Sequence, residues 1–371
     1  MKVLITGANG FVGKNLQLHL AERKDMQVVC FTRADDVDTL PALLDGVEFV
    51  FHLAGINRPQ DPAEFATGNA GLTQDLCTAL ATLKRPVPVL LASSAQAAQD
   101  NPYGRSKRAA EDAVRAYGTA TGAPVYLFRL PNVFGKWCKP NYNSAVATFC
   151  HNVARGLPIQ VNDPAAPVTL VYVDDAVARF VQLLEGADAA NGPDGFATVA
   201  PQHTTTVGEL ARLVQTFKDS RNTLMTERVG IGLMRALYST YVSYLPVEAF
   251  AYAVPQHGDP RGVFVEMLIT PDCGQFSFFT AHPGITRGGH YHHSKTEKFL
   301  VIKGQARFKF RHMHTGQEYE LYTNGSKAEV VETVPGWTHD ITNIGTDEMV
   351  VMLWANEVFD RDRPDTVACP L

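Results

Sequence analysis

Two residues in the first third of the chain have the spacing of an acid/base pair. Tyr103 and Lys107 stand four positions apart in NPYGRSKRAAED, so they share one face if this segment is a helix. An ammonium group beside a phenol lowers the phenol pKa, which makes tyrosine a usable proton donor or acceptor near neutral pH. Ser93 and Ser94 end a predicted strand shortly before, and either hydroxyl can hydrogen-bond a reacting oxygen. An isolated pair of this kind is usually a surface feature, so its meaning depends on its surroundings.

A second group of candidates lies in the last third of the chain, which holds eight of the twelve histidines. Side chains alternate along a strand, so His290 and His292 share a face, and Glu297 can reach the same centre from the next strand. His339 can supply a fourth ligand, whereas His293 points the other way and is expected to be structural or exposed. Three imidazoles and a carboxylate suit Zn, Fe, Mn or Ni. A histidine-rich surface loop is the alternative, and His292 can also move a proton instead of binding metal.

A third group, at the start of the chain, has the pattern of a dinucleotide-binding turn. Gly7, Gly10 and Gly13 follow the apolar run KVLIT and precede a segment with helical spacing. Glycine lets the backbone approach a pyrophosphate, whose charge is stabilised by the helix N-terminus. Arg33, at the end of the second predicted strand, favours the 2′-phosphate of NADP. Two aspartates follow it closely, and they keep NAD as the alternative.

Two kinds of fold must position these residues. Up to about residue 185, short apolar runs alternate with helical patterns, which is typical of a parallel sheet with helices on both faces. From Val263 onward, short β-type runs separated by Gly, Pro and Asn predict an all-β sandwich or barrel. We therefore expect an α/β doubly wound domain over 1–247 and an all-β domain over 248–371.

The first half of the chain resembles the extended short-chain dehydrogenase/reductase family, through the motifs TGANGFVG, HLAG, NAG, LASS, YGRSK, RLPNVFG and VYVDDAV, in this order. The resemblance implies a Rossmann fold, with Tyr103 as the acid/base and Lys107 on the nicotinamide ribose. It implies that Ser94 or Ser93 binds the substrate oxygen. The cofactor residues that it implies are Gly7, Gly10, Phe11, Val12, Gly13, Arg33, Leu53, Ala54, Gly55, Asn69 and Lys107. Many members act on nucleotide-sugars, and the implied substrate residues are Asn132, Lys136 and Lys139.

One departure from the family narrows the reaction. The nucleotide-sugar dehydratases of this family carry an Asp-Glu pair just after the catalytic hydroxyl residue, where it eliminates water. Here Ser94 is followed by Ala95 and Gln96, and neither can act as an acid or a base. The sequence therefore favours a net reductase, or an epimerase that recycles its cofactor.

The part of the chain from roughly 255 to 360 is similar to the cupin family. The spacing G-x5-H-x-H-x4-E-x6-G, from Gly284 to Gly304, matches the first cupin motif at every signature position. The second motif usually reads P-x-G-x2-H-x3-N, and here it is shortened by one residue before the glycine. The resemblance implies a cupin barrel that binds a divalent metal, with zinc as the first choice. The implied ligands are His290, His292, Glu297 and His339.

The order and size of the two parts resemble the bifunctional enzymes of UDP-N-acetyl-L-fucosamine biosynthesis, which serve bacterial capsule and O-antigen polysaccharides. The resemblance implies a homodimer that acts on a UDP-linked 4-keto-6-deoxy-HexNAc. The cupin domain would epimerise C3, and the reductase domain would then reduce C4 with NADPH. Two alternatives stay open. One is a nucleotide-sugar 4-epimerase or reductase whose cupin is a non-catalytic dimerisation or sensing module, and the other is a non-enzymatic NADP-binding redox sensor.

The composition fits this reading. The 371 residues are 45% hydrophobic and 19% charged, with a net charge of −5, which argues against nucleic acid or an anionic membrane as partner. No apolar run reaches the roughly 18 residues that span a bilayer, so we expect a cytoplasmic protein. Six cysteines are scattered without a CxxC spacing and are expected to be reduced and structural.

Overall fold

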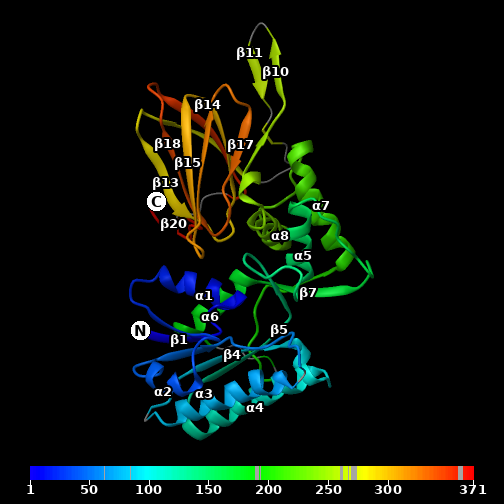
Figure 1. The fold of residues 1–371 in the computed structure, drawn as a ribbon, viewed down its shortest axis with the longest axis vertical. Helices are drawn as coiled ribbons and strands as arrows, with labels where there is room; N and C mark the ends of the chain where they lie inside the picture. The colour runs from blue at the N-terminus through cyan, green and yellow to red at the C-terminus, as the bar shows by residue number, and fades with distance from the viewer. Residues whose placement is uncertain are drawn as a thin grey trace. The chain divides into compact units, whose positions relative to one another are not determined.

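The computed structural model describes the whole chain except residues 62, 84, 189–191, 193, 260–261, 266, 269–273 and 358–361. The described residues form two compact units (Figure 1). The first contains 1–134 and 169–204, and the second contains 135–168 and 205–371. The predicted fold class is confirmed, with a Rossmann-type parallel sheet in the first unit and a cupin-type all-β barrel in the second.

The first unit is built on a five-stranded parallel sheet with the strand order β2-β1-β3-β4-β5. Its strands are the predicted apolar runs, and β3 is buried at every position. The chain leaves β1 to one side for β2 and to the other side for β3, so a crevice forms at the carboxyl ends of β1 and β3. The strands are β1 (Lys2–Thr6), β2 (Gln27–Phe31), β3 (Phe49–His52), β4 (Val89–Ser94) and β5 (Val125–Leu130).

Helices cover both faces of this sheet, as a doubly wound fold requires (Figure 1). Helices α1 (Phe11–Ala21) and α6 (Val173–Leu184) cover one face, and α3 (Leu72–Ala81) and α4 (Pro102–Thr121) cover the other. Shorter elements complete this part of the chain. They are η1 (Val37–Thr39), α2 (Leu40–Leu43), η2 (Ala66–Gly71), η3 (Ala95–Ala98) and a small sheet of β6 (Asn132–Phe134), β7 (Pro167–Tyr172) and β8 (His203–Thr206).

The second unit contains two antiparallel five-stranded sheets, in the orders β12-β19-β14-β17-β9 and β16-β15-β18-β13-β20. Apolar side chains from both sheets form its core, and the rings of Phe299 in one sheet and Phe308 in the other lie 5.6 Å apart. The strands are β9 (Ala251–Ala253), β12 (Gln275–Ala281), β13 (Thr286–Tyr291), β14 (Glu297–Lys303), β15 (Gln305–His312), β16 (Glu318–Asn324), β17 (Glu329–Glu332), β18 (Trp337–Asn343), β19 (Met349–Ala355) and β20 (Val367–Ala368), with a hairpin of β10 (Gln256–Asp259) and β11 (Gly262–Val265).

Three helices and a short turn belong to this unit as well. They are α5 (Ala145–Ala154), α7 (Val207–Thr223), α8 (Gly232–Ser243) and η4 (Val247–Ala249). Segments 135–168 and 205–247 thus group with the barrel, although the sequence assigns them to the reductase domain. The predicted boundary after residue 247, as a division between two activities, stays a prediction.

Helix α7 begins with one half of a capping box, at Thr206. The Thr206 hydroxyl accepts a hydrogen bond from the Glu209 N–H at 3.2 Å. The Glu209 carboxylate instead pairs with Arg212 one turn later, at 2.7 and 2.8 Å. Only half of the reciprocal motif forms, because an exposed salt bridge competes for the second partner.

A cluster of buried charges ties α7 and α8 to the barrel. The Glu332 carboxylate, at the end of β17, accepts hydrogen bonds from Arg221 of α7 and from Lys298 of β14. The Tyr238 hydroxyl of α8 donates to the same carboxylate at 3.2 Å. Burial alone would raise the pKa of Glu332, but Arg221 and Lys298 hold it below its usual value. The helices are therefore fixed to the sheet by charge as well as by apolar packing.

Two further expectations can be compared with the structure. In the described part of the chain, no helix is both long and apolar enough to cross a membrane. Five of the six cysteines are free thiols, and Cys273 lies outside the described residues.

We expect Glu332→Gln to lower the free energy of unfolding by about 3 to 5 kcal/mol, because it leaves two buried cations without a counter-charge. Urea denaturation followed by circular dichroism measures this loss. Because the pKa of Glu332 is lowered in the folded protein, its carboxylate contributes to the free energy of unfolding at neutral pH, and this contribution is lost as the pH falls into the acid range.

The matched control is Glu209→Gln, which removes an exposed carboxylate from an ion pair. Its expected loss is below about 1 kcal/mol, since solvent screens the pair with Arg212. Equal losses for the two variants would contradict the structural role of the buried cluster.

Candidate functional site

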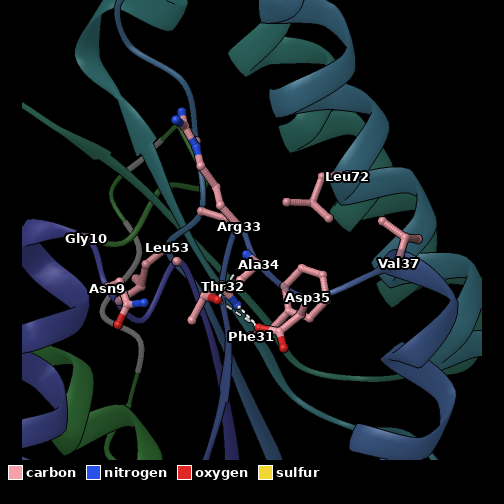
Figure 2. Close-up of a pocket in the computed structure, with 13 residues that line it drawn as sticks. Asn9, Gly10, Phe31, Thr32, Arg33, Ala34, Asp35, Val37, Leu53 and Leu72 are labelled. Atoms are coloured by element: carbon pink, nitrogen blue, oxygen red, sulfur yellow. Dashed lines mark hydrogen bonds between the residues drawn. The ribbon is translucent and has the colours of Figure 1, made fainter.

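A cavity of about 560 Å³ opens in the first unit at the carboxyl ends of β1, β2 and β3 (Figure 2). This is the crevice where open α/β sheets bind ligands. Several of the predicted cofactor residues line it. They are Gly7, Gly10, Arg33, Leu53, Ala54 and Gly55.

The glycine turn is packed too closely for side chains. Gly7 has φ of +69°, and a Cβ on it would lie 2.7 Å from the backbone of Ala54. A Cβ on Gly13 would lie 2.4 Å from the carbonyl oxygen of Gly7. The Gly10 N–H donates to that same oxygen at 2.8 Å, which closes the turn. Phe11, Val12 and Gly13 form the first turn of α1, so the N-terminus of this helix follows the cavity directly.

Two charged residues after β2, Arg33 and Asp35, differ in their contacts. Asp35 turns back toward the strand, where its Oδ2 accepts hydrogen bonds from the Thr32 N–H at 2.7 Å and the Thr32 hydroxyl at 2.8 Å (Figure 2). The Arg33 side chain extends away from Asp35 and forms no salt bridge in the described part of the chain (Figure 2). Arg33 is thus the available charge at this rim of the cavity.

Tyr103 and Lys107 lie on one face at the start of α4, as the spacing predicts. Asn101 caps the helix by accepting a hydrogen bond from the Gly104 N–H at 2.7 Å. The Tyr103 hydroxyl donates to the side-chain oxygen of Asn57 at 3.0 Å, and its ring lies 5.5 Å from that of Phe65. The sequence did not indicate Asn57, because nothing in its motif links it to a residue 46 positions away.

Lys107 is buried at the edge of the cofactor cavity. Its Nζ donates to the Ala92 carbonyl of β4 at 3.0 Å, and a Cβ on Gly55 would lie 3.4 Å from this nitrogen. Burial lowers the pKa of Lys107 to about 8, while the Glu111 carboxylate opposes that shift. An ammonium in this place can bind a ribose hydroxyl and act on the phenol one turn earlier.

The two adjacent serines have different partners, because side chains alternate along β4. The buried Ser93 hydroxyl donates to Glu111 Oε1 at 2.5 Å. Glu111 is in turn held by Arg129 through two hydrogen bonds of 2.7 and 3.0 Å. Ser94 is only half-buried, and its hydroxyl accepts a hydrogen bond from the Gln96 N–H at 3.2 Å. The geometry favours Ser94 as the hydroxyl available to a reacting oxygen.

Two further motif residues brace the loop after β3. Asn69 binds both backbone groups of Ile56, at 2.8 and 3.1 Å, and donates to the Ser106 hydroxyl at 3.0 Å. His52 lies between the hydroxyls of Thr6 and Thr73, at 2.6 and 2.8 Å. Burial lowers the pKa of His52 to about 3, so its ring is neutral. These contacts connect the cavity wall to α3 and α4.

The three predicted substrate residues fall in different units. Asn132 belongs to the first unit and donates to the Thr169 carbonyl at 3.2 Å. Lys136 and Lys139 belong to the second unit. Lys136 is buried, with its Nζ 5.6 Å from the centre of the Trp137 ring, whereas Lys139 is exposed. Their role in substrate binding stays a prediction.

The four predicted metal ligands lie together in the second unit. One ligand atom from each of His290, His292, Glu297 and His339 lies within 4.8 Å of the others. The register of the sheet explains this, because His290 of β13 stands directly opposite His339 of β18. His293 lies outside this group and is buried, so it is not exposed, and its structural role stays a prediction.

The charge states of this group suit a cation. Burial lowers the pKa of His290 to about 3, and burial also lowers the pKa of His339, so both rings are neutral. Burial alone would raise the pKa of Glu297, but His292, His339 and Lys295 hold it well below its usual value. Neutral imidazoles and an ionised carboxylate are the forms that bind metal.

The contacts of Glu297 and His339 within this four-residue cluster are compatible with a divalent metal. Glu297 Oε2 lies 3.1 Å from Nε2 of His292 and 3.5 Å from Nε2 of His339. The His339 ring nitrogens are buried, and within the described residues they have no hydrogen-bond partner. A buried polar atom without a partner is costly, and a bound cation would remove that cost. Lys295, whose Nζ lies 2.9 Å from Glu297 Oε1, was not indicated by the sequence.

Two segments of the chain match known protein families. Residues 3–197 match the NAD dependent epimerase/dehydratase family. Residues 257–367 match the polysaccharide biosynthesis C-terminal domain.

Full-length relatives are known for the sequence and for the structure. The chain is 63% identical over 369 residues to the UDP-2-acetamido-2,6-beta-L-arabino-hexul-4-ose reductase of Pseudomonas aeruginosa, covering 100% of this chain and 98% of that protein. The crystal structure of the capsular polysaccharide assembling protein CapF from Staphylococcus aureus is 43% identical, with a TM-score of 0.69 and complete coverage of both chains. The UDP-glucuronic acid 4-epimerase of Bacillus cereus, at 19% identity and a TM-score of 0.50, covers 58% of this chain and 83% of its own, and shows the fold alone.

We expect Gly13→Ala to weaken the binding of a nicotinamide dinucleotide by about tenfold or more, which corresponds to about 1.4 kcal/mol. The added methyl group would lie 2.4 Å from the Gly7 oxygen, so the turn must move. Fluorescence titration with NADPH and NADH measures the change. Gly71→Ala is the control, since its methyl group would lie 3.6 Å from the nearest atom. Equal affinities in the two variants would count against this turn as the binding site.

Proposed function

Because this chain belongs to the NAD dependent epimerase/dehydratase family, we propose that it is a bifunctional enzyme that epimerises and then reduces one UDP-linked 4-ketosugar. The substrate is a UDP-2-acetamido-2,6-dideoxy-4-hexulose, and the product is UDP-2-acetamido-2,6-dideoxy-L-talose, on the way to UDP-N-acetyl-L-fucosamine. Residues 1–247 carry out the reduction, and residues 248–371 carry out the C3 epimerisation. The chain acts as a homodimer, which the family resemblance implies.

The observation that carries this proposal is the presence of two separate clusters of candidate catalytic side chains in one chain. Lys107 lies against Gly55 in the wall of the cavity, Tyr103 lies one turn before it on α4, and Ser94 ends β4. The histidines and the glutamate of the barrel form a metal-sized cluster in the other unit. The full-length similarity to a UDP-hexulose reductase supports the reduction step and the class of sugar.

The reduction needs one hydride and one proton. A bound nicotinamide would supply the hydride to C4, and Tyr103 would give its hydroxyl proton to the C4 oxygen, so that the ketone becomes a hydroxyl group. Lys107 binds the nicotinamide ribose and favours the ionised phenol that remains. Ser94 holds the C4 oxygen during the transfer, whereas Ser93 is bound to Glu111.

NADPH is the proposed cofactor because Arg33 is the available charge at the rim of the cavity. A guanidinium suits the 2′-phosphate, while a free carboxylate there would select the 2′-hydroxyl of NAD. Asp35 is occupied by the two hydrogen bonds from Thr32.

The epimerisation depends on the ketone at C4, which acidifies the proton on C3. A divalent metal, zinc on the type of its ligands, supplies a Lewis acid that strengthens this effect. His290, His292, Glu297 and His339 hold it. The neutral imidazoles of His290 and His339 and the ionised carboxylate of Glu297 are already in the forms that bind a metal.

We expect the enzyme to introduce deuterium at C3 when the UDP-4-ketosugar is incubated in D2O without NADPH. Proton NMR measures the loss of the C3 signal. His290→Ala should abolish this exchange because it removes a metal ligand, and His282→Ala, which alters an exposed histidine of the same unit, should leave it unchanged. An absence of exchange in the wild type would refute the epimerase activity, and normal exchange in His290→Ala would refute the need for the cluster.

We expect Tyr103→Phe to slow the reduction by about 10²- to 10⁴-fold, since it removes the proton donor. The fall in NADPH absorbance with the UDP-4-ketosugar measures this rate. Deuterium exchange at C3 should continue, because it takes place at the barrel. Tyr126→Phe, on β5 of the same unit, is the matched control. A Tyr103→Phe rate close to that of the wild type would show that another group donates the proton.

A further inference from the structure

The turn between β13 and β14 binds a carboxylate from the far end of the chain. The N–H groups of His293, Ser294 and Lys295 donate to the Asp365 carboxylate at 2.8, 2.8 and 2.7 Å. The Ser294 hydroxyl donates to the same group at 2.9 Å. Successive N–H groups that point to one centre form an anion-binding nest, and here the anion is a side chain of the protein itself.

The main chain of Asp365 makes a second contact, with a candidate metal ligand. Its carbonyl oxygen lies 2.5 Å from Nδ1 of His292. A carbonyl can only accept, so His292 Nδ1 is the donor in this contact, and Nε2 is the ring nitrogen left to face the cluster. This Nε2 is the atom that faces Glu297, at 3.1 Å. One residue thus holds the turn between the two ligands and also fixes the ring of the first.

Asp365 is itself held in place on both sides. Strand β20 follows directly and pairs with β13, with Val367 opposite Tyr291 and Ala368 opposite His290. From α8, the Arg235 guanidinium lies 3.7 Å from the Asp365 carboxylate and donates to the Ser294 hydroxyl.

We propose that Asp365 is a positioning residue for the metal site, which sets the direction and tautomer of His292 and fixes the turn that leads to Glu297. The inference rests on the proposed function, because it assumes that the cluster binds a metal. It also assigns His292 as a ligand rather than as a group that moves a proton, since its Nε2 is directed into the cluster. Partners of this kind behind a metal ligand commonly change metal affinity by about 10- to 100-fold when they are removed.

The test is the metal affinity of the full-length chain after its metal has been stripped with a chelator. Zinc is titrated against a competing chromophoric chelator, and Co²⁺ is used separately for its visible absorption. Asp365→Asn keeps the size of the side chain but turns an acceptor into an amide donor that faces the N–H groups. Asp163→Asn is the matched control, because its carboxylate accepts a backbone N–H from Ala165 at 2.9 Å elsewhere in the same unit.

We expect Asp365→Asn to bind zinc about 10- to 100-fold more weakly than the wild type and to alter the Co²⁺ spectrum, while Asp163→Asn leaves both unchanged. A lower melting temperature with unchanged zinc affinity and Co²⁺ spectrum would overturn the inference, since it would show a purely structural role. If Asp365→Asn does not fold, Ser294→Ala decides: weaker zinc binding supports the inference, and unchanged binding overturns it.

The proposed function fails in a different way. A wild-type chain that binds neither zinc nor Co²⁺ would refute the metal site itself. Tight binding by the wild type together with unchanged affinity in Asp365→Asn would overturn the role of Asp365 alone.

Discussion

Buried charge must be paired, and in both units this requirement fixes where the reactive side chains lie. Glu111 is fully buried one turn beyond Lys107 on α4, and Arg129 holds it through two hydrogen bonds. It binds Ser93 and opposes the loss of charge at Lys107. In the other unit, Glu332 binds a cation from a helix and a cation from a strand. An unpaired partner would cost several kcal/mol, so these carboxylates allow few alternative arrangements.

Around the metal cluster, two carboxylates have different tasks. Glu297 is directed into the cluster and stays ionised because His292, His339 and Lys295 outweigh the effect of its burial. Asp365 is directed away from it and binds backbone N–H groups of the turn. The first supplies a ligand atom, and the second removes freedom from the segment that presents the ligands. The pairing of β13 with β18 already places two of the histidines opposite each other. Metal binding therefore loses little conformational entropy in ordering these side chains.

The sequence was sufficient for the fold and for the residues that share a local pattern. Periodicity places Tyr103 and Lys107 on one helix face, and motif spacing brings the four ligands of the barrel together. It could not distinguish Ser93 from Ser94, because alternation along a strand gives two faces without saying which is buried. It could not indicate Asp365, because the three N–H groups that bind its carboxylate lie 70 to 72 positions earlier and carry no side-chain signature. Segments 135–168 and 205–247 group with the barrel through tertiary contacts that no local pattern records.

Under the proposed function, the two activities must run in one order. The C3 proton is acidic only while C4 is a ketone, because the negative charge left at C3 is delocalised onto the C4 oxygen. Reduction at C4 removes the ketone and therefore fixes the configuration at C3. Epimerisation alone is reversible and yields a mixture, whereas hydride transfer withdraws one epimer from it. The reductase must then bind the C3-epimerised ketone in preference to the original one, so the stereochemical outcome depends on selection at the Tyr103 site as much as on exchange at the metal.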